Sequence, residues 1–236
     1  MAPLTRSARG FTRTELLVIL ALIGILIILA IPFVTGVLLR GALISCVSNA
    51  RFIHLATFSM ATDGEANKDP ALGWPGDLKV TGRIANLSDF VSILVSNHYF
   101  SPGELVFFSN TGFKSYVPNA SYKPYKGTLS SGSNGVLDPP FTDENCAYKI
   151  FLVKKDDPAD TVFLTSKNYT YNTLLNPNAK PYGDKGFIVM HKGGDVSVFK
   201  KEEAQTLQFN QSFRYVGPLP GGSTVESAEN CLNPGQ

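Results

Sequence analysis

The sequence has little of what a catalytic or metal-binding site needs. Its three histidines, His54, His98 and His191, are scattered along the chain, and no two of them have metal-ligand spacing. The HExxH, CxxC, GxSxG, P-loop and GxGxxG motifs are all missing. These gaps argue against an enzyme, and we expect neither a cofactor nor a bound metal.

Net charge is also nearly absent. The chain carries 21 basic and 19 acidic side chains, for a formal charge of +2, and Arg6 and Arg9 account for that excess. A nearly neutral chain offers no electrostatic argument for binding nucleic acid. Internal repeats and long low-complexity linkers are missing too.

Charge is completely missing from residues 16–39, between Glu15 and Arg40. About 20 apolar residues cross the ~30 Å hydrocarbon core of a bilayer as a helix. A soluble core helix of this length would show a polar face, and this one shows none. A cleaved secretory signal is the alternative, but its apolar part is only ~7–15 residues long and ends at a small-residue cleavage site. The span therefore predicts a membrane helix.

Three basic residues precede the span, Arg6, Arg9 and Arg13, whereas Arg40 alone follows it closely. Lys and Arg near a membrane span favour the cytoplasmic side. We therefore expect a single-pass inner-membrane protein with a cytoplasmic N-terminus and a periplasmic or extracellular C-terminal part.

The order of Gly10, Phe11, Thr12 and Glu15 before this long apolar stretch resembles the type IV prepilin N-terminal signature. Type IV pilins and type II secretion pseudopilins share that signature. The resemblance covers residues 9–40 specifically and the rest of the chain only in general layout. It divides the chain into a leader (1–10), a long N-terminal helix (11–62, with its membrane part at 16–39) and an exported globular domain (63–236).

The resemblance also implies a processing step. A membrane-embedded prepilin peptidase would cut between Gly10 and Phe11 and methylate the new Phe11 amine. A residue without Cβ lets a protease approach the backbone closely, which suits Gly10. Glu15 would then neutralise the Phe11 amine of a neighbouring subunit and set the register of assembly. The remaining partners implied are identical or related pilin-like subunits and an inner-membrane assembly platform.

Beyond the membrane part the helical pattern continues. Apolar residues recur at three- and four-residue steps, which predicts a buried stripe: Leu39, Leu43, Cys46, Ala50, Ile53 and Met60. Gly64 and Pro70 are expected to end the helix near Thr62. Pro32 should kink it, because proline removes one helical hydrogen bond and its ring clashes with the preceding turn.

The sequence pattern of the exported part predicts an α+β, pilin-like fold, in which the long helix packs on an antiparallel sheet. Trp74 lies in a turn-rich loop and is expected to cover the core beside the helix. A short helix should begin after Ser88, its N-cap. One face of this helix is formed by Phe90, Val91, Leu94 and Val95. Residues 147–153 and 161–165 read as strands, and residues 186–200 read as a hairpin that turns at two glycines.

The chain has three cysteines. Because an exported domain meets oxidising conditions, Cys146 and Cys231 are expected to form a disulfide. Cys46, on the helix stripe, should stay free. Two unpaired outer thiols are the alternative, since a sequence cannot give the distance between Cα atoms.

Asp184 and Asp195 sit near the predicted hairpin, where exported pseudopilins often bind calcium. No D-x-D-x-D run accompanies them, so we interpret both as solvated turn residues.

Three functions remain open: a filament subunit, a membrane-tethered binding module that uses the prepilin route only for export, and an anchored enzyme. The missing motifs argue against the enzyme. Glu15 favours assembly, because a simple tether needs no acid at the edge of the membrane. The choice between a pilus and a secretion pseudopilus stays open.

Overall fold

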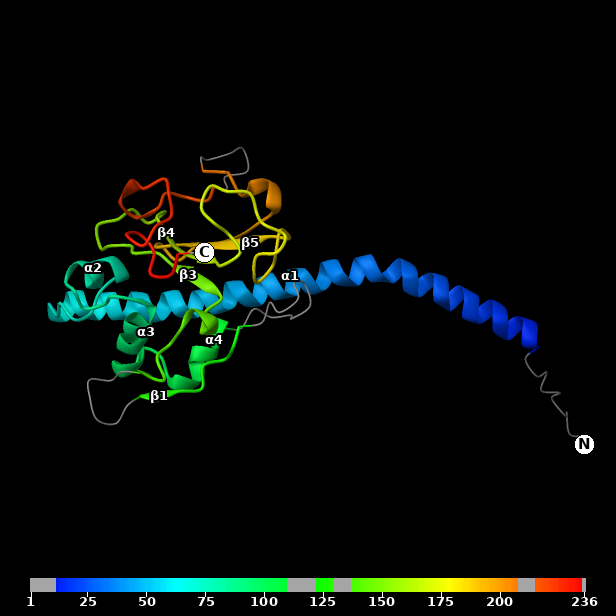
Figure 1. The fold of residues 1–236 in the computed structure, drawn as a ribbon, viewed down its shortest axis with the longest axis horizontal. Helices are drawn as coiled ribbons and strands as arrows, with labels where there is room; N and C mark the ends of the chain where they lie inside the picture. The colour runs from blue at the N-terminus through cyan, green and yellow to red at the C-terminus, as the bar shows by residue number, and fades with distance from the viewer. Residues whose placement is uncertain (1–11, 110–121, 130–136, 208–214, 235–236) are drawn as a thin grey trace, which may run out of the picture. The chain divides into compact units, whose positions relative to one another are not determined.

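The computed structural model describes residues 12–109, 122–129, 137–207 and 215–234. The chain separates into two compact units, Met1–Arg40 and Gly41–Gln236. Helix α1 (Arg13–Asn67) begins in the first unit and ends in the second (Figure 1). The long helix is as predicted, although it ends five residues beyond Thr62.

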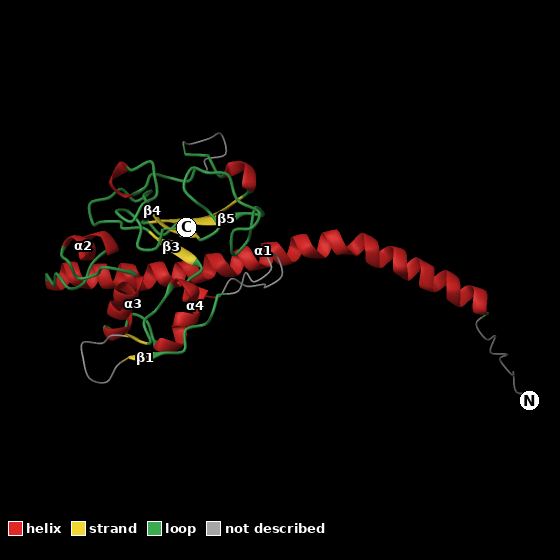
Figure 2. Cartoon of the chain, viewed as in Figure 1, coloured by secondary structure: helices red, strands yellow, loops and turns green. Residues whose placement is uncertain are grey.

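Mixed α and β elements make up the second unit (Figure 2). The helices after α1 are α2 (Pro75–Val80), α3 (Leu87–Ser96) and α4 (Val106–Ser109). Short 3-10 turns are η1 (Pro102–Leu105), η2 (Asp143–Asn145), η3 (Lys201–Glu203) and η4 (Pro220–Gly222). A small antiparallel pair joins β1 (Thr128–Leu129) to β2 (Leu137–Asp138). The main antiparallel sheet has the order β3 (Tyr148–Ile150), β4 (Val162–Ser166), β5 (Phe187–His191) and β6 (Val196–Phe199).

The outer part of α1, residues 41–67, buries one face within this unit. Its buried apolar side chains recur at the predicted steps: Leu43, Cys46, Ala50, Ile53 and Met60. The Tyr148 hydroxyl of β3 donates to the Cys46 carbonyl at 3.2 Å. The rings of His54 and Phe163, from α1 and β4, meet edge to face at 5.7 Å. The sheet therefore packs against this part of α1, on the side opposite α3 and α4 (Figure 1).

The end of α1 differs from the prediction because Gly64 lies inside the helix. A Cβ at Gly64 would come within 2.3 Å of the Leu72 carbonyl oxygen. Glycine is therefore needed here for the close return of the chain after α1. The Asp69 amide donates to the Gly64 carbonyl at 2.9 Å and closes the helix end.

Trp74 has only 5% of its surface exposed and packs against the domain core as predicted. Its ring lies 5.9 Å from that of Phe163 and 6.2 Å from that of Phe58. The following residues form α2 rather than a loop, because Pro75 occupies the first helical position, where a missing N–H costs nothing.

The apolar face of α3 is buried as predicted, but its N-cap is Asn86 instead of Ser88. The Asp89 amide donates to Asn86 Oδ1 at 3.0 Å, and the Asn86 amide donates to Asp89 Oδ2 at 3.2 Å. Ser88 instead accepts a bond from the Phe141 amide at 3.1 Å. The N-cap was predicted at Ser88 because the usual signal of a capping box is Ser or Thr followed by Glu or Gln. Here Asn86 and Asp89 form the same reciprocal pair of hydrogen bonds.

Strands β5 and β6 form the predicted hairpin, paired from Phe187 opposite Phe199 to Met190 opposite Val196. Its turn uses Gly194 at a φ of 93°, a conformation that side chains with Cβ rarely adopt.

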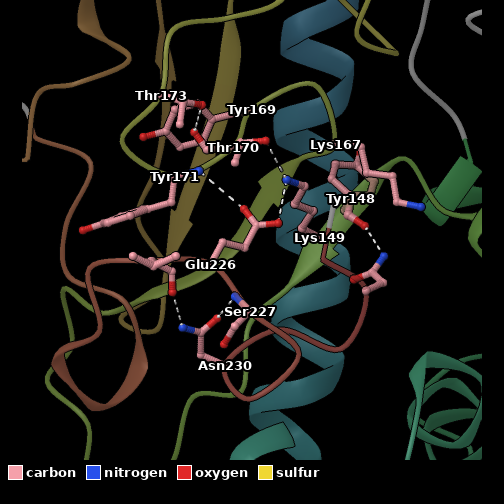
Figure 3. A network of polar contacts seen from close by, with 12 residues as sticks. Tyr148, Lys149, Lys167, Tyr169, Thr170, Tyr171, Thr173, Glu226, Ser227 and Asn230 are labelled. Atoms are coloured by element: carbon pink, nitrogen blue, oxygen red, sulfur yellow. Dashed lines mark hydrogen bonds and ion pairs between the residues drawn. The ribbon is translucent and has the colours of Figure 1, made fainter. Parts of the chain in front are cut away.

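The C-terminal segment covers the outer edge of β3, an arrangement that the sequence did not predict. Cys231 pairs with Phe151 in an antiparallel bridge, and the Leu232 amide donates to the Ile150 carbonyl at 2.9 Å. Lys149 Nζ lies 2.7 Å from Glu226 Oε1, and their side chains are 0% and 4% exposed (Figure 3). This buried ion pair ties the segment to the sheet, and removing one partner would leave an uncompensated charge.

Candidate functional site

The N-terminal part of α1 is a long apolar surface. Residues Arg13–Ile31 form the one helix in the described part of the chain that is long and apolar enough to cross a membrane. None of this stretch is buried inside the protein. Its leucine and isoleucine side chains are 39–68% exposed. By length and composition it suits either a membrane span or a signal sequence.

Glu15 lies in the first turn of α1, where it forms a capping box with Thr12. The Thr12 amide and hydroxyl both donate to Glu15 Oε2 at 2.8 Å, and the Glu15 amide donates to Thr12 Oγ1 at 3.2 Å. The box therefore gives the carboxylate a partner on its own helix and directs it toward the N-terminus. This capping role was not predicted, although a Thr followed three residues later by Glu is its usual sequence signal.

Gly10 and Phe11, the predicted processing residues, lie outside the described residues. Thr12, which follows Phe11 directly, is the described residue nearest to them. Pro32 falls inside the bounds of α1, but nothing is described of its side chain. Cleavage, methylation, the pairing of Glu15 with an amine and the kink at Pro32 all stay predictions.

The predicted disulfide is not formed, because Cys46, Cys146 and Cys231 are all free and buried. Cys231 lies opposite Phe151, whereas Cys146 precedes Phe151 by five residues. Five residues of largely extended chain span roughly 15 Å. A disulfide needs Cα atoms within about 7 Å of each other, so the two thiols are too far apart along the sheet edge.

Asp184 is not the solvated turn residue that we expected. Its carboxylate lies 2.7 Å from Lys201 Nζ and 3.2 Å from Lys185 Nζ, and its side chain is only 16% exposed. Hydrogen bonds from Lys201 and then Lys185 lower its pKa. Asp195 is 65% exposed at its side chain and contacts His191. Within the described ranges, no three His, Cys, Asp or Glu side chains gather as a metal site would require.

A polar hollow of about 530 Å³ lies on the domain surface. Tyr122, Lys167 and Lys180 line it, together with threonine and asparagine side chains. Lys167 is already paired with Asp143 at 3.0 Å and lies over the Tyr122 ring at 5.8 Å. One of the two lysines that line the hollow is thus neutralised from within the domain.

Comparisons with protein-family models, with curated proteins and with solved structures find no match for this chain. The described residues form a mixed α/β chain with an N-terminal apolar helix and antiparallel sheets.

Proposed function

We propose that this chain is a structural subunit of a type IV pilus-like or type II secretion pseudopilus filament. The observation that carries the proposal is the run of Gly10, Phe11 and Glu15 at the start of an apolar helix, Arg13–Ile31, of which no part is buried among the described residues. An acid at the start of such a helix is costly in a membrane unless it is paired. Cleavage before Phe11 would create the positive amine that pairs with it.

The proposed topology places the leader in the cytoplasm and residues 41–236 outside the inner membrane. Arg6, Arg9 and Arg13 would hold the processing site at the inner surface, where a prepilin peptidase could act. An inner-membrane assembly platform would then extract the mature subunit into a filament with its relatives.

Assembly needs a driving force beyond hydrophobicity, because lipid tails are as apolar as leucine. Small residues such as Gly24 and Ala30 allow close helix packing, and apart from the backbone of its own helix no described atom lies within 4 Å of where a Cβ on Gly24 would stand. Neutralising Glu15 with a neighbour's amine would supply the rest. The capping box with Thr12 would satisfy the carboxylate before a neighbour arrives.

Processing is tested by the intact mass of the protein extracted from membranes of a host that has prepilin peptidase. The mature chain should begin at Phe11 and carry one methyl group. The Gly10→Val variant should remain uncut, because a branched side chain crowds the bond to be cleaved. A wild-type chain that still begins at Met1 would count against the proposal.

Assembly is tested by comparing Glu15→Leu with Thr12→Val, since both remove side-chain hydrogen bonds of the capping box but only the first removes the carboxylate. Both variants should insert and be processed. Sheared filaments, measured by sedimentation and electron microscopy, should be absent for Glu15→Leu and present for Thr12→Val. If the two variants assemble equally well, Glu15 does not set the register, and a membrane-tethered binding module becomes the better interpretation.

A further inference from the structure

The polar hollow of about 530 Å³ is built from stretches that lie far apart in the sequence. Its lining comes from Tyr122, from Asp143 in η2, from the loop after β4 (residues 167–180) and from Pro234 in the C-terminal segment. Its volume is typical of sites that bind small molecules. The convergence of distant segments on one concave surface makes the hollow a candidate binding site.

Two buried groups fix the loop that forms most of the hollow. Lys149 Nζ donates to Thr170 Oγ1 at 3.4 Å, and Glu226 Oε2 accepts from the Tyr171 amide at 3.4 Å (Figure 3). The Thr173 hydroxyl donates to the Thr170 carbonyl at 2.8 Å. The wall of the hollow is therefore largely preformed, and a ligand that binds there need not order it first.

Three side chains of the hollow have hydrogen-bonding capacity that the described residues leave unused. Asn168 is 3% exposed, and its Nδ2 donates to two backbone carbonyls at 2.8 and 2.9 Å, but its Oδ1 has no partner in the described ranges. Such a buried acceptor is costly unless a donor reaches it. The Asn176 Oδ1 accepts a backbone amide at 2.9 Å, which leaves its Nδ2 available as a donor. The Lys180 ammonium attracts Glu144 electrostatically, but it forms no ion pair or hydrogen bond with the described residues.

The chemistry of these groups selects a class of ligand. Acceptors and donors lie along one hollow, which suits hydroxyl groups because each of them can both accept and donate. A phosphate offers only acceptors and would meet the Asn168 amide oxygen and the Asp143 carboxylate, whereas a metal cation would meet two lysines. Leu174, which is 67% exposed, offers apolar surface for the C–H face of a sugar ring. The unpaired ammonium of Lys180 calls for one negative group on the same ligand.

We propose that this hollow binds an acidic saccharide, a sugar whose ring carries a carboxylate. The carboxylate lies at the Lys180 ammonium, the ring hydroxyls bond with Asn168 Oδ1 and Asn176 Nδ2, and the apolar face of the ring packs on Leu174. Lys167 takes no part through its charge, because Asp143 already neutralises it. This binding does not depend on the proposed filament, so it can be tested whether or not the chain assembles.

The test is isothermal titration calorimetry of the full chain in micelles of a detergent without a sugar headgroup, since a sugar headgroup would compete for the site. The probes are the dimers of glucuronic, galacturonic and mannuronic acid, each compared with the neutral dimer of the parent hexose. At least one acidic dimer should bind saturably and about threefold more tightly than its neutral counterpart, the effect of one exposed ion pair. The absence of saturable binding by all three acidic dimers, or equal binding of the neutral ones, would overturn the proposal.

A matched pair of lysine variants locates the site. Lys180→Gln should weaken binding of the acidic dimer about threefold. Lys68→Gln removes the same charge just beyond the end of α1, outside the hollow, and should leave binding unchanged. Equal weakening by both variants would mean that only net charge attracts the sugar, and the proposal would be wrong.

Asn176→Asp probes the hydroxyl contacts, because it keeps the oxygen that accepts the backbone amide and replaces the free N–H donor by a second acceptor. It should weaken binding of the neutral and acidic dimers alike. In ¹⁵N–¹H spectra of the parent chain, the bound sugar should shift the backbone amides of Asn168, Thr173 and Ala179. Shifts confined to residues outside the hollow would contradict the assignment.

Discussion

The inner and outer parts of α1 differ in where their apolar side chains find partners. The stretch Arg13–Ile31 has no buried part within the protein. Residues 41–67 bury one face, on which Cys46, Ala50 and Ile53 are fully covered. One continuous helix thus leaves its apolar side chains exposed at its beginning and buries them in a domain at its end. The hydrophobic pattern explains the difference, because the inner part is apolar all round and the outer part is apolar on one face only.

The strongest test of this comparison removes the inner part. Deleting residues 1–38 should give a soluble, monomeric domain, because the uncovered apolar helix and Glu15 are gone while the buried face of the outer part remains. Size-exclusion chromatography with light scattering measures the outcome. Filaments formed by the shortened chain would show that the domain of residues 41–236 carries the assembly contacts.

Thiol chemistry probes the buried face of the outer part. Burial raises the pKa of Cys46 to about 11 and that of Cys146 and Cys231 to about 12, so almost no thiolate exists at pH 8. Modification of the native protein by Ellman's reagent should be at least about a hundredfold slower than that of an ordinary thiol. A thiol introduced by Ser48→Cys, on the exposed face, should react quickly.

The same assay decides the disulfide. In 6 M guanidinium without reductant, the parent chain should release three reactive thiols, as the three free cysteines require. A single reactive thiol would mean that Cys146 and Cys231 are bridged.

Two isoleucines, one in each part of α1, allow the two parts to be compared by the free energy of unfolding. Ile53→Ala, at a fully buried position, should lower the free energy of unfolding of the domain by about 2–5 kcal/mol. Ile25→Ala, at a position 56% exposed, should change it by less than about 0.5 kcal/mol. Urea unfolding in detergent, followed by the fluorescence of Trp74, reports on the domain. Equal effects would mean that the two parts of α1 are not independent.

Glycines in the outer part should give smaller effects than the loss of the buried Ile53 side chain. Gly64→Ala should destabilise by about 1–3 kcal/mol, since the new Cβ meets the Leu72 backbone. Gly41→Ala, with no atom within 4 Å, should stabilise the helix by roughly 0.5–1 kcal/mol. A lower thermal midpoint for Gly64→Ala and a higher one for Gly41→Ala would show that the chain packs closely against α1 at its C-terminal end, where Gly64 meets Leu72. Shifts of the same sign would contradict it.

Local patterns in the sequence predicted the elements that depend on neighbours a few residues away. The apolar stripe of the outer helix, the buried face of α3 and the β5–β6 hairpin follow from periodicity and turn chemistry. At the candidate site, the sequence also predicted the apolar span and the position of Glu15 at its start. The capping boxes of Thr12 and Asn86 are equally local but were not predicted, because several neighbouring polar residues at each helix start can serve as the N-cap.

The sequence by itself therefore determined an apolar N-terminal helix, its acidic first turn and the succession of helices followed by strands in the domain. Only the tertiary structure decided which distant groups meet. Lys149 with Glu226, His191 with Val216 and Gly64 with Leu72 depend on the path of the chain between them. The separation of Cys146 from Cys231 has the same cause, because pairing along a sheet edge is set by register, and register involves residues far apart in sequence.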